Sequence, residues 1–162
     1  MISKVVMAKK SAGKSAVGCI LVCLFAVGSI AAYPAMSGEK GDPMDILVVV
    51  NVGVEAHALS VDVVRDFFLK NKTYWSATNK ALALHSTDKA LRNDFRDKVL
   101  QMSAAEEERY WIAEQVRGKK QEPVAFPNTL KAVFKLKGAV SYVYRKDFVG
   151  GVAKVVLVVP AH

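Results

Sequence analysis

The chain has 162 residues, enough for one globular domain, and 52% of them are hydrophobic. Four lysines before residue 15 supply half of the formal net charge of +8, so the rest of the chain carries 8 − 4 = +4. This mild surplus, without a dense basic run between aromatic residues, excludes a typical nucleic-acid-binding surface. Both cysteines lie between residues 16 and 32, so the sequence that follows must rely on its core rather than on disulfides.

The first 32 residues have the pattern of a secretory signal peptide. Lysines precede residues 16–32, which are almost wholly apolar, and small residues suited to cleavage lie around the end of this run. We therefore predict a signal peptide over residues 1–32, a flexible linker over 33–45, one domain over 46–160, and a periplasmic or secreted location. The alternative is an uncleaved N-terminal membrane anchor, although a spanning helix needs about 20 apolar residues.

Residues 46–50 form an unbroken run of Ile, Leu and three Val. A run this short and apolar predicts a strand buried on both faces, as in a parallel sheet under helices. A loop begins at Asn51, and Ser60 can cap a helix with apolar residues at helical spacing. These residues are Val61, Val64, Phe67 and Phe68.

The middle of the chain predicts a second strand and two helices. The strand covers residues 81–84 and ends at His85, and Ser86-Thr87-Asp88 is typical of a helix start. Ser103 and Glu106 have the spacing of a capping box at the start of the second helix. The apolar residues are Leu91, Phe95, Val99 and Met102 in the first helix, and Tyr110, Trp111, Ile112 and Val116 in the second, which ends near Gly118.

The last part of the chain predicts one helix and two strands. Asn128 can cap the helix, Gly138 can end it in a left-handed conformation, and residues 139–144 and 155–159 form the strands. The apolar residues predicted to face inward from this helix are Leu130, Val133 and Phe134. Strands interleaved with helices predict an α/β domain with a mixed or mostly parallel sheet flanked by helices.

The order of these landmarks resembles the periplasmic phosphate-binding proteins of bacterial ABC transporters. The resemblance covers about residues 46–159 and corresponds to one lobe of a two-lobed binding protein. It therefore implies a single lobe of a type II periplasmic-binding-protein-like fold. The residues that carry it are Asn51 after the first strand, Leu59-Ser60, Phe67-Phe68-Leu69, Trp75, Leu91-Arg92-Asn93-Asp94-Phe95, Tyr110-Trp111, Gly118-Lys119-Lys120-Gln121-Glu122-Pro123 and Gly138-Ala139-Val140-Ser141-Tyr142.

The resemblance implies an extracytoplasmic solute-binding protein for phosphate or another oxyanion. Binding is expected to be weak, because one lobe supplies half a site that is open to water. The family's Arg and Ser-Gly-Thr run have no direct counterpart, so Ser86, Thr87 and Arg92 are ligand-binding candidates by their position around a helix N-terminus. Plain helix capping by Ser86 and Thr87, and an ion pair of Arg92 with Asp88, are the alternatives. Asp88 would repel phosphate, although a protonated oxyanion could donate a hydrogen bond to it.

Other chemistry has no motif in the sequence. His57 and His85 lack metal-ligand spacing and no nucleophile motif is present, so we predict no metal site, cofactor, catalytic residue or enzyme activity. Trp75, Tyr110 and Trp111 are predicted to pack rather than to stack on a ligand. The alternative function is a non-catalytic interaction or structural protein of the envelope that kept the fold and lost its ligand. The predicted partners are thus a small oxyanion, an ABC permease or envelope protein, or a second copy in a homodimer.

Overall fold

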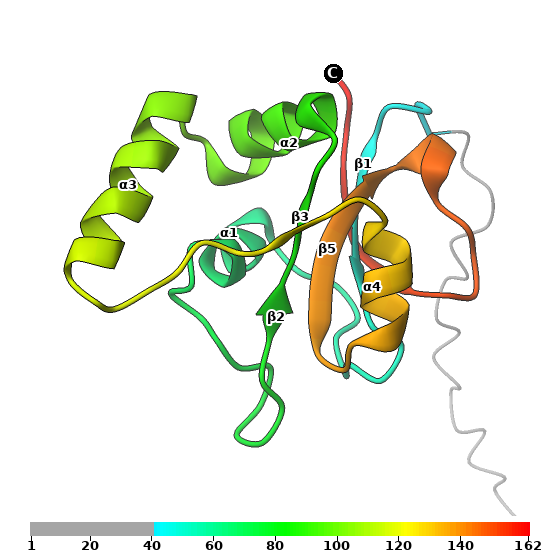
Figure 1. Ribbon diagram of the computed structural model, residues 1–162. Helices are drawn as coiled ribbons and strands as arrows, with labels where there is room; N and C mark the ends of the chain where they lie inside the picture. The colour runs from blue at the N-terminus through cyan, green and yellow to red at the C-terminus, as the bar shows by residue number, and fades with distance from the viewer. Residues whose placement is uncertain (1–40) are drawn as a thin grey trace, which may run out of the picture. The chain divides into compact units, whose positions relative to one another are not determined.

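The computed structural model describes residues 41–162, and its main sheet has four strands in the order β2-β5-β1-β6 (Figure 1). The central strand β1 (Ile46–Val50) pairs antiparallel with both β5 (Ala139–Tyr144) and β6 (Lys154–Val159). Strand β2 (Leu82–Ala83) pairs parallel with β5. The sheet is therefore mixed, which confirms one of the two predicted sheet types. The predicted burial of β1 on both faces is confirmed, but its two neighbours run antiparallel to it.

The remaining elements surround this sheet. The helices are α1 (Val61–Phe68), α2 (Lys89–Phe95) with its π-helical extension η1 (Arg96–Leu100), α3 (Ala104–Val116) and α4 (Thr129–Lys135). A second, two-stranded sheet pairs β3 (His85–Ser86) in parallel with β4 (Ala125–Phe126), and a short 3-10 turn η2 (Arg145–Asp147) follows β5.

The predicted signal peptide and residues 33–40 of the predicted linker lie outside the described residues. Among residues 41–162, no helix combines the length and the apolar character needed to cross a membrane.

Side-chain caps set the starts of the helices. Ser60 and Asn128 cap α1 and α4, and Ser103 forms the predicted capping box with Glu106 at the start of α3. The cap of α2 is Asp88, whose carboxylate accepts two backbone N–H groups, rather than Ser86 or Thr87. The first backbone N–H groups of a helix have no partner within the helix, and a polar side chain at the cap accepts from them. Because the cap is a neighbouring residue, three of these helix starts could be predicted from the local sequence.

Strand β1 is buried on both faces of the sheet, because its side chains are apolar on each face. Ile46, Val48 and Val50 belong to a core that includes residues of α1, α2, η1 and α3. Leu47 and Val49 face the opposite way and belong to a second core with α4. Successive side chains of a strand point to opposite faces, so a continuous apolar strand requires cover on both sides. Figure 1 shows α1 and α2 on one side of β5 and α4 on the other.

The predicted inward face of α4 is partly wrong, and two of the apolar residues of α3 are exposed. Phe134 of α4 is 54% exposed, and Ile112 and Val116 of α3 are 55% and 83% exposed. Helix α4 instead buries Thr129, Ala132 and Val133, and α3 buries Glu107, Trp111 and Glu114. On α3 the acidic residues turn inward because arginine and lysine side chains neutralise them there. A buried charge is tolerated when it is paired with an opposite charge. Because the paired carboxylates take the inward positions of α3, apolar side chains on its other face remain exposed.

Candidate functional site

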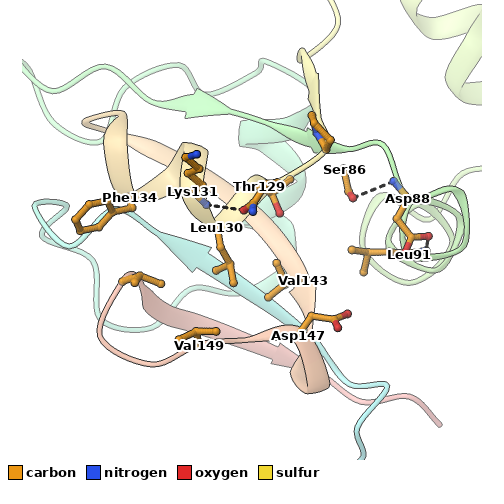
Figure 2. Close-up of a pocket in the computed structure, with 13 residues that line it drawn as sticks. Ser86, Asp88, Leu91, Thr129, Leu130, Lys131, Phe134, Val143, Asp147 and Val149 are labelled. Carbon is orange, nitrogen blue, oxygen red and sulfur yellow. Dashed lines mark hydrogen bonds between the residues drawn. The ribbon is translucent and has the colours of Figure 1, made fainter.

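A cavity of about 560 Å³ lies between the N-terminal ends of α2 and α4 (Figure 2). The connection from β5 to β6 closes its third side through Asp147 and Val149. Leu130 points from α4 toward the space bounded by Val143 and Val149, so this part of the wall is apolar (Figure 2). A concave site with an apolar wall and a few polar groups is the usual form of a small-molecule site.

The polar groups of this cavity mostly satisfy one another. The Asp88 carboxylate accepts from the backbone N–H groups of Ala90 and Leu91 at 2.9 and 3.2 Å, and the backbone N–H of Asp88 donates to the Ser86 hydroxyl at 3.1 Å. At the other helix start, the Asn128 side chain accepts the N–H of the third helical residue at 2.9 Å. A ligand at either helix end therefore has to compete with a side-chain cap.

The structure does not bring the three predicted ligand-binding residues together. Ser86 is buried and lines the cavity, whereas Thr87 is exposed and its backbone N–H donates to the carbonyl of Phe126 at 3.2 Å. Arg92 lines a second cavity, of about 340 Å³. Within the described residues its ion-pair partners are Glu107, at 3.2 Å, and Glu122, so the predicted pair with Asp88 is not formed.

The second cavity carries charges of both signs. The hydrogen bond to Glu122 and the negative charge of Glu107 outweigh the effect of burial and raise the pKa of Arg92, so its guanidinium stays cationic. Arg96 is also close to Glu107, at 3.7 Å. Trp111 lines this cavity, and its buried indole N–H has no hydrogen-bond partner among the described residues. The two partners of Arg92 lie 15 and 30 residues away along the chain, so no local spacing in the sequence could have predicted these ion pairs.

His85 lies beside these carboxylates. His85 has no metal-ligand spacing along the sequence, but in space ligand atoms of His85, Glu107 and Glu122 all lie within 4.8 Å of one another. Its Nδ1 is 2.9 Å from the hydroxyl of Tyr142. Burial, together with the positive charges of Arg92 and Lys70, lowers the pKa of His85 to about 3. Its ring is therefore neutral at physiological pH.

The aromatic residues pack as predicted. Trp75 lies 4.2 Å from Phe67 between ring centroids, and its indole N–H donates to the carbonyl of Gly138 at 2.8 Å. The Tyr110 hydroxyl donates to a backbone carbonyl just after α1 at 2.7 Å, and Trp111 is 4% exposed. These contacts place all three rings in the structural framework of the domain.

No protein-family model and no curated protein matches the sequence. The structure is similar to a solved structure described as a phosphate ABC transporter substrate-binding protein with bound phosphate, from Clostridium perfringens. The TM-score is 0.52 at 14% identity, over 71% of this chain and 46% of that one. An ABC-type phosphate transport receptor from Vibrio cholerae gives a TM-score of 0.53 at 12% identity, over 70% and 46%. The domain has a periplasmic-binding-protein-like fold.

This binding-protein-like domain confirms the fold that the sequence landmarks implied. The chain spans about half the length of each of these two proteins, 46% in both cases. Around the cavity of Figure 2, the domain supplies two carboxylates, Asp88 and Asp147, and one ammonium group, that of Lys131. With two acidic side chains and one basic side chain, the lining of this cavity is not that of a strongly anion-attracting site.

Proposed function

We propose that the domain is an extracytoplasmic solute-binding module that holds phosphate or another small oxyanion weakly. The carrying observation is the cavity between the N-terminal ends of α2 and α4, within a fold shared with two phosphate transport proteins. Helix N-termini present backbone N–H groups and partial positive charge, which favour an anion. The hydroxyl of Ser86 and the ammonium group of Lys131 supply further polar groups at the same wall.

The polar groups of the same cavity support the weak affinity and the selectivity that we propose. Asp88 and Asn128 already accept the helix-end N–H groups, and the carboxylate of Asp88 repels a fully ionised anion. Phosphate near neutral pH keeps at least one proton and can donate a hydrogen bond to a carboxylate, whereas sulfate has no proton with which to donate one. We therefore propose that phosphate binds in preference to sulfate, and that the Asp88 carboxylate accepts a hydrogen bond from it.

Thermal unfolding of the full-length chain with phosphate, and with sulfate at the same ionic strength, tests this proposal. A ligand at ten times its dissociation constant stabilises the folded state by about 1.4 kcal/mol. For a domain of this size that corresponds to a midpoint shift of roughly 3 to 8 °C. We expect a shift with millimolar phosphate and a smaller one with sulfate.

The variant Asp88→Asn is the matched control for the role of the carboxylate. Asparagine is as good a helix cap as aspartate, so α2 keeps its start while the negative charge is removed. We expect the variant to respond to sulfate as strongly as to phosphate. The absence of a shift with either anion, in the natural chain and in the variant, would show that the cavity is not an oxyanion site.

The exposed apolar residues of α3 favour a second candidate function, a non-catalytic interaction protein of the envelope. Ile112 and Val116 are one helical turn apart and face solvent, and an exposed apolar pair on a helix favours contact with another protein. The partner is proposed to be an envelope protein, an ABC permease or a second copy of the chain. The two solved structures compared above are described as transport proteins, which favours a role without catalysis.

Sedimentation tests the homodimer form of this candidate. If two copies meet through α3, the double variant Ile112→Glu and Val116→Glu should convert a dimer into a monomer without changing the unfolding midpoint by more than a few degrees, because both positions are exposed. A natural chain that sediments as a monomer at high micromolar concentration rejects the homodimer.

The proposed location is the periplasm or the exterior, after cleavage of a signal peptide of residues 1–32. A linker of residues 33–45 then precedes the domain of residues 46–160. The alternative is an N-terminal membrane anchor. The mass of the chain recovered from a secretion-competent host distinguishes the two, because cleavage removes the N-terminal segment and an anchor retains it.

A further inference from the structure

Three metal-binding side chains from distant parts of the chain meet beside the second cavity. His85 comes from β3, Glu107 from the first turns of α3, and Glu122 from the connection between α3 and β4. One ligand atom of each lies within 4.8 Å of the other two. Ligand atoms bound to one zinc ion at 2.0–2.2 Å are about 3.4 Å apart in a tetrahedral site, so the three groups need to approach one another by up to about 1.4 Å.

His85 is the second, independent indication of a ligand. The residue is 1% exposed, and its Nε2 atom has no hydrogen-bond partner among the described residues. Its Nδ1 atom lies 2.9 Å from the Tyr142 hydroxyl, which orients the ring. A metal-binding histidine usually has such a partner on its other nitrogen, because that bond fixes the tautomer and the direction of the free lone pair.

A cation already occupies the position between the two carboxylates. The guanidinium of Arg92 forms ion pairs with both Glu107 and Glu122. Arg92 is 27% exposed at its side chain and lines the open cavity, so its guanidinium can move toward solvent. A divalent ion and this guanidinium cannot both sit between the two carboxylates, because both are cations that need the same oxygen atoms.

We propose that His85, Glu107 and Glu122 bind one divalent transition-metal ion of the Zn²⁺ class, in competition with the side chain of Arg92. One imidazole and two carboxylates suit zinc and its first-row neighbours, whereas Mg²⁺ and Ca²⁺ prefer oxygen ligands alone. The buried pair, His85 and Glu107, anchors the ion, and Glu122 closes the site from the surface side. None of the three residues lines the cavity proposed for the oxyanion, so the two proposals are independent.

Calorimetric titration of the full-length chain with Zn²⁺ tests the proposal, with Mg²⁺ as the comparison ion. Cys19 and Cys23 are replaced by serine in every protein, because thiolates bind zinc strongly and would mask the site. We expect one equivalent of Zn²⁺ to bind with micromolar affinity, a rise in the unfolding midpoint, and no response to Mg²⁺.

Two variants assign the site and the competition. Glu122→Gln keeps the shape of a partly exposed side chain and is expected to weaken Zn²⁺ binding at least tenfold, as is His85→Gln if that variant folds. Arg92→Gln removes the competing cation and is expected to tighten binding at least tenfold. The matched control is the pair His57→Gln and His162→Gln, because both histidines are exposed and lie outside the cluster.

Each other result overturns the proposal. No binding of Zn²⁺, or binding that Glu122→Gln leaves unchanged, excludes the cluster as the site. Loss of binding in the variants of His57 and His162 assigns the ion to exposed histidines. If Arg92→Gln does not tighten Zn²⁺ binding, the guanidinium does not compete with the ion and the proposed competition is wrong.

Discussion

Replacement of Phe95 by alanine is expected to lower the free energy of unfolding by about 3 to 5 kcal/mol. Phe95 is fully buried, stacks parallel to Tyr142 with ring centroids 3.8 Å apart, and lies 4.6 Å from Phe68. Its ring therefore fills the space between α2, α1 and β5. The truncation removes the transfer energy of the ring and leaves a cavity that the surrounding strands and helices cannot close.

Phe134→Ala is the matched control for Phe95→Ala. The same atoms are removed, but Phe134 is 54% exposed, so we expect a loss of less than about 1 kcal/mol. Chemical denaturation of both variants measures the difference directly. Comparable losses in the two variants would mean that Phe134 is packed inward, as the apolar pattern of the helix predicts, and that the observed orientation of α4 is wrong.

Replacement of Gly138 by alanine is expected to cost about 3 kcal/mol or more. Gly138 has φ of +75°, a conformation that costs other residues about 1 to 2 kcal/mol. A Cβ atom there would also lie 2.1 Å from the carbonyl oxygen of Lys80. The backbone at Lys80 and Gly138 cannot move apart freely, because the residues that follow each of them pair β2 with β5. The Gly138 carbonyl also accepts hydrogen bonds from the backbone N–H of Leu82 and the indole N–H of Trp75.

Gly118→Ala separates the two causes. Gly118 has a similar φ of +63°, but a Cβ atom there meets no described atom within 4 Å. We expect a loss of only about 1 to 2 kcal/mol, from the left-handed conformation alone. If denaturant midpoints show equal losses at the two glycines, the close approach of Lys80 does not restrict Gly138, and the left-handed backbone accounts for the whole effect.

Features that depend on a few neighbouring residues were predictable from the sequence. The run of apolar residues in β1, the caps Ser60 and Asn128, and the box of Ser103 with Glu106 each act within four residues or fewer. The left-handed turn at Gly138 is equally local in its sequence signal. The order of these local elements also carried the fold resemblance, because a fold of this class is specified largely by the sequence of its strands and helices.

The candidate site was less predictable, because long-range ion pairs decide where its side chains lie. Ser86 lines the cavity, but Arg92 turns to Glu107 and Glu122 instead of Asp88. The nearness of Arg92 to Asp88 along the helix suggested a local pair, but Asp88 is already used as the helix cap. The choice of partner thus depended on residues that only folding brings near.

The sequence by itself determined the main strands and helices of the domain and their order, since apolar spacing, caps and glycines act through nearest neighbours. It did not predict the short strands β3 and β4. The tertiary structure alone decided that β1 is antiparallel to its neighbours, that Glu107 lies inside while Ile112 lies outside, and that His85 meets two carboxylates. The physical reason is that strand pairing and the burial of charge depend on partners far along the chain. A buried carboxylate is stable only beside its cation, and the cation for Glu107 comes from another helix.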